Sequence, residues 1–347
     1  MKKYNFTGWD IGGAHLKVAN VSNEGKILSI DQYATPLWKG LPVLENALLN
    51  IIKKISKEKQ SHAITMTAEL TDIFKNREEG VNSIIKLCHK ILGKNISFYT
   101  MNYGLKKKNI NMLDVNQIAS ANWHASATYV ASFIESGLFV DVGSTTTDII
   151  PFYKNKIHSL GVDDQTRLRF DELIYTGVVR TPIMSLTSKA IFNNHTQNII
   201  NENFATTADI YRILGYLNEY DDLSETADGE DKSISSSIRR LARILGTDSI
   251  TDNKDHWLEL SKYFHEVQIE ILMKAIKNVF LRLPRKKHVI VSAGVGHFLI
   301  KIIAERLNIP CIRFSDLFDC NITSQHNSNV CAPAVAIAQL NRLSQVK

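Results

Sequence analysis

Two short segments decide the fold of this 347-residue chain: Asp-Ile-Gly-Gly-Ala at residues 10–14 and Asp-Val-Gly-Ser-Thr at residues 141–145. Each follows an apolar, strand-like run. Each is followed by a second such run, a turn and the pair Lys-Ile, at residues 26–27 and 156–157. One glycine hairpin of this kind indicates little by itself, but two copies with nearly equal spacing favour a duplicated α/β unit. The sequence therefore predicts two related halves, each beginning with a β-hairpin.

Apolar spacing outward from these hairpins predicts alternating strands and helices. Helical spacing at 44–55 and 81–92 alternates with strand-like runs at 63–66 and 96–99, and a long amphipathic helix is expected at 257–283. The other expected strands lie at 4–9, 16–21, 26–33, 138–142, 149–153, 156–160, 288–292 and 310–314, and the other expected helices at 122–134, 207–217, 234–245, 297–306 and 333–343. Low-complexity tracts and linkers are absent from the sequence, which predicts intertwined domains.

The composition excludes a wholly disordered chain and argues against a dedicated nucleic-acid binder. Apolar residues make up 44% and charged residues 22%, as is ordinary for globular proteins. The 41 Lys and Arg against 35 Asp and Glu give a net charge of +6, a small excess spread over a long chain. The short basic runs at 106–108 and 285–287 are typical of solvated loop ends. We expect a small molecule as partner, and no nucleic acid.

Cysteine usage and hydropathy predict the compartment. Four cysteines without a C-x-x-C pair indicate reduced thiols rather than a disulfide framework or a zinc site. The N-terminal stretch meets an acid and two glycines by residue 13, so it lacks the apolar core of a signal peptide. No uninterrupted apolar run reaches the ~18 residues of a membrane span. These features predict a cytoplasmic protein with no membrane partner.

The paired glycine hairpins are suited to binding phosphate. Glycine lacks a Cβ, so backbone N–H groups approach an anion closely, and the hydroxyl groups at 144–147 add donors. Asp10 and Asp141 end the first strands, where carboxylates would hold Mg²⁺ mostly through its waters. The alternative is a pair of ordinary glycine turns with satisfied acids. Repetition of the motif favours the phosphate site.

A third glycine turn, Gly294-Val295-Gly296, follows an apolar strand and opens a helix. Leu299 stands where a dinucleotide-binding turn has its third glycine, but such a turn still holds a phosphate or an adenosine against a helix N-terminus. A P-loop is excluded at the first hairpin, because Ala14 and His15 stand where Lys and Ser or Thr are required. The predicted phosphate- or nucleotide-binding residues are Gly12, Gly13, Lys17, Gly143, Ser144, Thr145, Thr146, Gly294 and Gly296.

Together the three glycine motifs resemble the nucleotide-site motifs of the acetate kinase, sugar kinase, Hsp70 and actin (ASKHA) superfamily. Residues 141–148 are similar to the Asp-x-Gly-Gly-Thr-Ser-Thr-Asp form of hydantoinase A and oxoprolinase proteins. More narrowly, the chain resembles, from about residue 6 to its C-terminal helix, a small subfamily linked to tetrahydromethanopterin-dependent C1 transfer. The strings that carry this resemblance are WDIGGAHLK at 9–17, TAELTD at 67–72, ANW at 121–123, YTGVVRT at 175–181 and TADG at 226–229.

This resemblance implies an α/β protein with a duplicated ribonuclease H-like, actin-like ATPase fold. We expect two lobes with the ligand site in a central cleft. The first lobe is placed at 1–135 and the second at 136–330, with a helical insertion at about 165–285. The C-terminal helix, about 331–347, is a candidate to pack back on the first lobe.

The resemblance also implies a reaction. Subfamily members studied as enzymes make a methanofuran precursor by joining a furanmethanol diphosphate to the phenol of glutamyl-tyramine, and they release diphosphate. This implies a transferase that uses Mg²⁺ and a phosphorylated small-molecule substrate. ATP is possible but not required, because Ala14 replaces a hydroxyl residue that often contacts phosphate in kinases.

Two other functions stay open: an ATP-dependent hydantoinase- or oxoprolinase-like hydrolase or small-molecule kinase, and a nucleotide-binding regulator without catalysis. The sequence leaves the oligomeric state undecided, with a homodimer possible.

The candidate catalytic residues include a base for the phenol, whose unperturbed pKa is about 10. Glu69 is preferred, followed by His15 and Asp148, beside the metal-positioning Asp10 and Asp141. A solvated turn acid is the alternative for Glu69, and a packed strand residue is the alternative for His15.

The candidate substrate-binding residues lie in the strings that carry the resemblance: Asn122, Arg180 and Asp228. Arg180 would bind a carboxylate, such as the glutamyl group, with two hydrogen bonds. The acidic loop at 219–231 would act as a lid, with Asp228 reaching the amine of the furan substrate. The alternative is a solvated loop whose charge is balanced by the arginines of the following helix.

Overall fold

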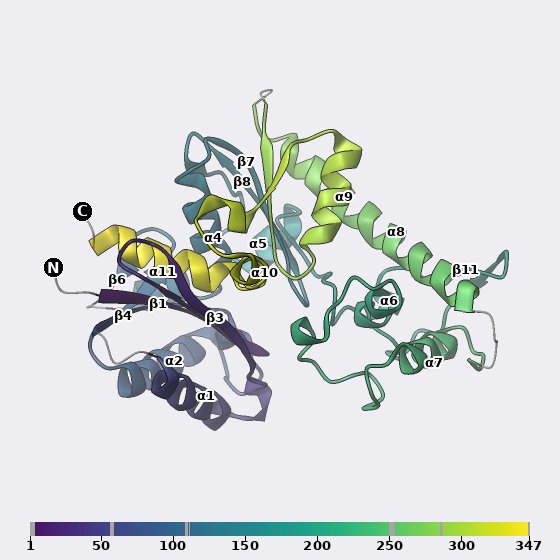
Figure 1. Ribbon diagram of the computed structural model, residues 1–347, viewed down its shortest axis with the longest axis horizontal. Helices are drawn as coiled ribbons and strands as arrows, with labels where there is room; N and C mark the ends of the chain where they lie inside the picture. Colours follow the sequence, from purple (N-terminus) through teal and green to yellow (C-terminus); the bar gives the residue numbers. More distant parts are fainter. Residues whose placement is uncertain are drawn as a thin grey trace. The chain divides into compact units, whose positions relative to one another are not determined.

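The computed structural model describes residues 4–55, 59–107, 110, 112–249, 254–284 and 287–345 (Figure 1). The chain divides into two compact units. Lobe 1 consists of residues 1–136, 152–158 and 312–347, and lobe 2 of residues 137–151 and 159–311. Each lobe is built around its own β-sheet.

The first part of the chain forms β1 (Tyr4–Ile11), β2 (His15–Val21), β3 (Ile27–Ala34), α1 (Leu41–Lys54), β4 (Lys59–Met66), α2 (Arg77–Leu92), β5 (Ile96–Thr100), β6 (Gly104–Lys106), α3 (Met112–Ile118) and α4 (Asn122–Ala131). The remainder forms β7 (Ser136–Val142), β8 (Thr147–Tyr153), β9 (Lys156–Ile157), α5 (Asp164–Arg169), β10 (Leu173–Ile174), β11 (Lys189–Phe192), β12 (His195–Asn198), α6 (Thr207–Ile213), α7 (Ile234–Ile244), α8 (Lys254–Phe280), β13 (Val289–Ala293), α9 (His297–Leu307), β14 (Cys311–Arg313), α10 (Ile322–Val330) and α11 (Ala332–Gln345).

The two sheets repeat one strand order. The lobe 1 sheet runs β3-β2-β1-β4-β5-β6, with β1 antiparallel to β2 and parallel to β4. The lobe 2 sheet runs β10-β8-β7-β13-β14, and β9 also pairs with β8. In both sheets the first strand lies between its hairpin partner and a parallel strand from much later in the lobe. The predicted duplicated ribonuclease H-like fold is confirmed.

Side-chain alternation gives the lobe 1 sheet two different buried faces. On one face, Trp9 and Ile11 of β1 share an apolar core with Leu48 of α1 and Ile84 of α2. On the other face, a smaller core joins Ala63 and Tyr99 to residues of α4 and α11. Figure 1 shows α1 and α2 on one side of this sheet and α11 on the other. The sheet is therefore covered on both faces, as its parallel strands require.

The packing of α11 on β1 depends on Gly8. A Cβ at this position would lie 2.1 Å from the carbonyl oxygen of Ala334 and 2.6 Å from the backbone nitrogen of Ala338. Both belong to α11, whose buried face is rich in alanine. The helix backbone therefore lies directly on the strand, and this close contact fixes where α11 begins relative to the end of β1.

The expected helices and strands are present, with ends shifted by a few residues. The helix expected at 122–134 ends at Ala131, and the one expected at 257–283 runs from Lys254 to Phe280. The sequence patterns did not predict β6, α3, α5, β10, the β11–β12 hairpin or α10. The hairpin had a local signal, because Asn193 and Asn194 form its turn with φ values of 50° and 63°, which Asn tolerates better than most residues.

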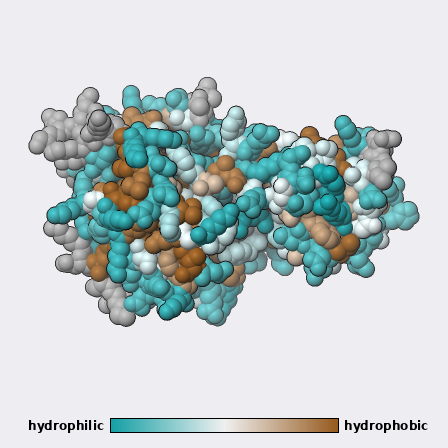
Figure 2. Space-filling view, turned by 90° about the horizontal axis from the view of Figure 1, so that it is seen from below, coloured by the Kyte–Doolittle hydropathy of each residue, from teal (hydrophilic) through white to brown (hydrophobic). Residues whose placement is uncertain are grey.

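Within the part of the chain that the structure describes, no helix is long and apolar enough to cross a membrane. The face shown in Figure 2 is mostly hydrophilic, with hydrophobic side chains in separate groups.

We expect Gly8→Ala to destabilise lobe 1 by about 3 kcal/mol or more, because the added methyl group cannot fit without moving α11. Urea unfolding measures the loss. Gly215→Ala is the matched control, since Gly215 has a φ of +74° but no atom lies within 4 Å of the place that its Cβ would take, and it should cost only about 1 kcal/mol. Equal losses for the two variants would contradict this account.

A buried histidine makes the stability depend on pH. His62 is 5% exposed and accepts a hydrogen bond from Trp9 Nε1 to its Nδ1 over 3.2 Å, and burial lowers its pKa to about 4. In the unfolded chain the His62 side chain binds a proton near pH 6.5, whereas in the folded protein it stays neutral down to about pH 4. The free energy of unfolding is therefore highest above pH 6.5 and falls as the pH is lowered toward 4. In urea unfolding, the loss of unfolding free energy across this range should be about 3 kcal/mol smaller for His62→Gln than for the parent protein. A variant that keeps the full dependence would refute the assignment to His62.

Candidate functional site

Two of the three predicted glycine motifs meet in lobe 2. The backbone N–H of Gly296 donates to the carbonyl oxygen of Val142 over 2.8 Å. Gly294 has a φ of +83°, and a Cβ there would lie 2.2 Å from the Val142 carbonyl oxygen and 2.4 Å from Asp141 Oδ1. Only glycine fits both this conformation and this spacing. The turn that opens α9 is therefore held directly against the carboxylate that ends β7.

The turn between β7 and β8 is tight and partly accessible. The N–H of Gly143 donates to the carbonyl oxygen of Thr146 over 2.8 Å, which closes the turn. Ser144, Thr145 and Thr146 are half-buried, and the hydroxyl oxygens of Ser144 and Thr145 lie 3.5 Å apart. The predicted phosphate-binding hydroxyl groups thus lie together on one short turn.

A third segment, residues 177–181, packs on this turn. A Cβ at Gly177 would lie 2.5 Å from the carbonyl carbon of Ser144. The backbone N–H groups of Val179 and Arg180 donate to the Ser144 carbonyl oxygen over 3.1 and 2.8 Å. The Arg180 side chain is exposed, although its backbone takes part in this contact. Its backbone therefore belongs to the same group of loops as Asp141 and Gly294.

Residues that the sequence analysis missed hold this segment in place. Gln268 of α8 is fully buried, and its Nε2 donates to the carbonyl oxygen of Gly177 over 2.9 Å and to Thr176 Oγ1 over 2.8 Å. Its Oε1 accepts from the hydroxyl group of Tyr211 over 2.5 Å, and Thr207 Oγ1 donates to the carbonyl oxygen of Gly177. The sequence signal that could have identified Gln268 is its position as a polar residue on the apolar face of an amphipathic helix.

Asp148 forms an ion pair with Arg167 within lobe 2. Arg167 of α5 donates to Asp148 Oδ1 over 2.6 Å and to the carbonyl oxygen of Glu172 over 3.0 Å. The Arg167 side chain is 2% exposed, so this contact anchors α5 to β8 from inside the lobe. The carboxylate predicted as the third choice of base is thus engaged in a structural contact.

In lobe 1 the first glycine hairpin is fixed by backbone hydrogen bonds. The N–H of Gly12 donates to the carbonyl oxygen of His15, and the N–H of Leu37 donates to that of Gly13, both over 2.9 Å. The N–H of Thr67 donates to the carbonyl oxygen of Ile11 over 2.9 Å, which brings the turn after β4 against the hairpin. His15 is half-buried at the start of β2.

Asp10 and Lys17 are directly paired across β1 and β2, so their side chains project from the same face. Gly8 precedes Asp10 by two positions, so this is the face that α11 covers. Asp10 is 5% exposed. Lys17 Nζ donates to the carbonyl oxygen of Val330, at the end of α10, over 2.9 Å. The ammonium group thus binds a helix C-terminus, where a cation is favourable.

Glu69 is buried in the turn that follows β4. It is 1% exposed, and its Oε1 accepts from the Ser120 hydroxyl over 2.8 Å. Gly80 of α2 packs closely against the backbone of Glu69, since a Cβ at Gly80 would lie 2.7 Å from the Glu69 carbonyl oxygen. Ser120 has a φ of 49° and lies just before α4, whose first residue, Asn122, accepts from the Trp123 N–H through its side chain. The Glu69 carboxylate is therefore buried and hydrogen-bonded, and it is not a solvated turn acid.

Asp228 belongs to a network of ion pairs in the helical part of lobe 2. Its two carboxylate oxygens accept from Arg240 over 2.9 Å and from Arg243 over 3.0 Å. Arg240 is fully buried and also binds Asp209. Burial raises the pKa of Asp228, but the hydrogen bonds from Arg240 and from the Glu230 N–H, with the charges of both arginines, hold it below its usual value. This placement favours the charge-balanced loop over a lid that reaches an amine.

The carboxylates of the two glycine hairpins are the candidate ligands for the predicted magnesium ion. Among the described residues, no cluster of three or more His, Cys, Asp or Glu side chains could hold a metal ion. Each glycine hairpin offers one carboxylate near the end of a strand, Asp10 in lobe 1 and Asp141 in lobe 2, while the N–H groups of Gly12 and Gly143 are used within their turns. Mg²⁺ keeps several waters and is usually bound by one or two carboxylates plus substrate phosphates. Each of the two carboxylates is therefore of the kind that holds Mg²⁺ beside a substrate phosphate.

Comparison with known proteins supports the resemblance seen in the sequence. Residues 60–342 match the model of the family described as Hydantoinase/oxoprolinase. A relative from Methanocaldococcus jannaschii, named (4-{4-[2-(gamma-L-glutamylamino)ethyl]phenoxymethyl}furan-2-yl)methanamine synthase, is 32% identical over 342 residues, 97% of this chain and 98% of the relative. A protein of the same name from Methanococcus vannielii is 32% identical over 176 residues, 50% of this chain and 78% of that protein.

Among solved structures, the nucleotide-free structure of acetone carboxylase superposes with a TM-score of 0.51 at 9% identity. It covers 96% of this chain and 69% of that one. At this identity the likeness shows the fold alone. The family match and the full-length relative carry the assignment, and this chain belongs to the hydantoinase/oxoprolinase family.

Proposed function

We propose that this chain is a transferase that forms an aryl ether between a furan-methyl group and the phenol of a tyramine derivative. The observation that carries the proposal is the 32% identity, over 97% of this chain and 98% of the relative, to a synthase whose name states that product. The same proposal places the chain in the cytoplasm, in the synthesis of a methanofuran-type cofactor of tetrahydromethanopterin-linked C1 metabolism.

The reaction that we propose uses an aminomethyl-furanmethanol diphosphate and glutamyl-tyramine. The phenol oxygen forms a bond to the furan-CH₂ carbon, and the bond from that carbon to the diphosphate oxygen breaks. The electron pair leaves with diphosphate, and the phenolic proton passes to a base. The furan ring oxygen delocalises positive charge at the CH₂ carbon, so departure is easy once the diphosphate charge is stabilised. The protein mainly has to hold the diphosphate and aim the phenol.

Lobe 2 supplies the residues that we propose for the diphosphate. Gly143, Ser144, Thr145 and Thr146 form a tight, partly accessible turn with adjacent hydroxyl groups. The turn at 294–296 leads into α9, whose N-terminus favours an anion through the helix dipole. Three segments fixed by backbone hydrogen bonds form this arrangement. Because the N–H groups of Gly143 and Gly296 are used in it, the hydroxyl groups of the turn are the donors that we propose for the diphosphate.

Asp10 and Asp141 are the residues that we propose for Mg²⁺. When bound, this ion neutralises charge on the leaving diphosphate. Asp141 is fixed by the close approach of Gly294, and Asp10 is nearly buried beside Lys17. Lys17 would exchange its bond to the Val330 carbonyl oxygen for a phosphate oxygen. ATP has no required place in this reaction.

Glu69 is our proposed base for the phenol, with Ser120 as its positioning residue. Their 2.8 Å hydrogen bond orients the carboxylate within a turn that lies against the first glycine hairpin. Arg180, exposed next to the Ser144 turn, is our proposed partner for the glutamyl carboxylate. Asp148 and Asp228 are already engaged by arginines and receive no role in the reaction.

We expect Asp141→Asn to lower Mg²⁺-dependent turnover by about 100-fold or more, with the fold retained, because the amide removes a charge without changing the size of the side chain. Diphosphate release, followed by ³¹P NMR with the furan diphosphate and glutamyl-tyramine, gives the rate, and circular dichroism checks the fold. Unchanged turnover would remove Asp141 from the mechanism. Protein that ignores the furan diphosphate but splits ATP with a hydantoin or oxoproline would overturn the proposed function.

We expect Gly294→Ala to weaken diphosphate binding about 10-fold or more, because a methyl group would displace the 294–296 turn from Asp141 and Val142. Isothermal titration with magnesium diphosphate measures this. Gly246→Ala is the matched control in lobe 2: Gly246 has a φ of +69°, but its nearest neighbour to a Cβ is a side-chain carbon 3.6 Å away. The control should bind like the parent protein. Equal weakening in both variants would show that the turn has no specific part in binding.

A further inference from the structure

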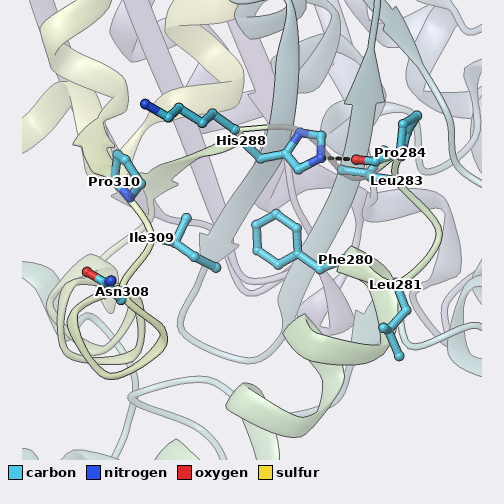
Figure 3. A pocket seen from close by; sticks show the side chains of 9 residues that line it. Phe280, Leu281, Leu283, Pro284, His288, Asn308, Ile309 and Pro310 are labelled. Atoms are coloured by element: carbon cyan, nitrogen blue, oxygen red, sulfur yellow. Dashed lines mark hydrogen bonds between the residues drawn. The ribbon is translucent and has the colours of Figure 1, made fainter.

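Lobe 2 has a pocket of about 660 Å³ at the end of its sheet opposite to the glycine loops (Figure 3). Strand β13 begins at Val289, beside the pocket, and ends at Ala293, where the 294–296 turn follows. Helix α9 runs from this turn to Leu307, and the next residue, Asn308, lines the pocket. Four strand residues rise about 13 Å. A molecule in the pocket is therefore separate from one bound at the glycine loops.

The walls of the pocket are mainly apolar. They come from the end of α8 and the turn after it, which contribute Phe280, Leu281 and Leu283, and from the α9–β14 connection, which contributes Ile309 and Pro310. In the view of Figure 3, the Phe280 ring lies between Ile309 and the turn that carries Leu283. Leu281 is 84% exposed. A volume of this size, with such walls, is typical of a site for a small organic molecule.

Hydrogen bonds from the strand region hold both sides of the pocket. The carbonyl oxygen of Pro284 can only accept, so the His288 ring donates to it through Nε2–H over 2.6 Å. On the other side, the N–H of Ile290 donates to the carbonyl oxygen of Pro310 over 2.9 Å. The His288 ring also lies against Phe280, with centroids 5.9 Å apart. These contacts tie Pro284 and Pro310, which lie on the two sides of the pocket, to the start of β13.

The charge of the pocket indicates the kind of ligand. Among the described residues that line the pocket, Lys287 is exposed and carries a permanent positive charge, and none is an acid. A cation at the rim of an apolar pocket favours a molecule with an apolar body and one anionic group. A neutral apolar molecule would leave the ammonium group unused, and an amine would be repelled by it.

We propose that this pocket binds a small amphipathic carboxylate, with its aryl or alkyl body against Phe280 and Ile309 and its carboxylate at Lys287. The proposal does not rest on the proposed function, because it uses none of the residues assigned to the reaction.

The test uses 4-phenylbutyrate and its neutral analogue 4-phenylbutan-1-ol as probes, with the full chain, titration calorimetry and saturation-transfer NMR. The carboxylate should bind more tightly than the alcohol. Lys287→Glu should weaken the carboxylate about 10-fold or more and leave the alcohol unchanged. Leu281→Glu should weaken both, and because Leu281 is mostly exposed the variant should fold.

Matched controls change exposed residues elsewhere. Lys274→Glu reverses a charge on the exposed side of α8, and Leu28→Glu replaces a leucine of β3 that is 53% exposed. Neither should alter the affinity for either probe. Three outcomes would overturn the proposal: no binding of the carboxylate at millimolar concentration, binding that survives both pocket substitutions, or a dimer in solution that Leu281→Glu dissociates. The last result would assign the face to a second copy of the chain.

Discussion

Direct contact between backbones, without a side chain in between, is the constraint on which the rest of this structure depends. At Gly294 the chain passes so close to Val142 and Asp141 that a single methyl group would collide with both. At Gly177 it meets the Ser144 turn in the same way. Because these contacts use peptide groups, the course of the chain sets the positions of the Ser144 turn and of the backbone that carries Asp141. Preorganisation of this kind is what stabilisation of a departing anion requires.

The glycine motifs could be predicted because their cause is local. A tight turn that ends a strand needs glycine at a fixed offset, and repetition of that offset in Asp10–Ala14 and Asp141–Thr145 reveals the duplication. The fold followed from this repeat. The ends of α8 and the existence of α10 could not be predicted in the same way, because they depend on which apolar residues find partners from distant parts of the chain.

In the candidate site, too, local features could be predicted from the sequence and long-range contacts could not. Glu69 is visible as an acid in a suggestive string, but its burial depends on Gly80 from α2 and Ser120 from the segment before α4. Gln268 has no recognisable motif, because its role consists of hydrogen bonds to groups on other elements. Asp228 is a plausible substrate ligand in sequence, but the arginines of the following helix are its partners in the structure. Residues defined by turns can be predicted from sequence, whereas residues defined by long-range partners need coordinates.

The position of α11 has a consequence for biosynthesis. This helix is made after every other element described in the chain, yet it covers the strand that is made first, through the contact at Gly8. During translation, one apolar face of the lobe 1 sheet is therefore covered only in part, by α4, until all of lobe 2 has emerged from the ribosome. Exposed sheet surface of this kind promotes aggregation. Termination before α11 should therefore leave this face exposed and promote aggregation.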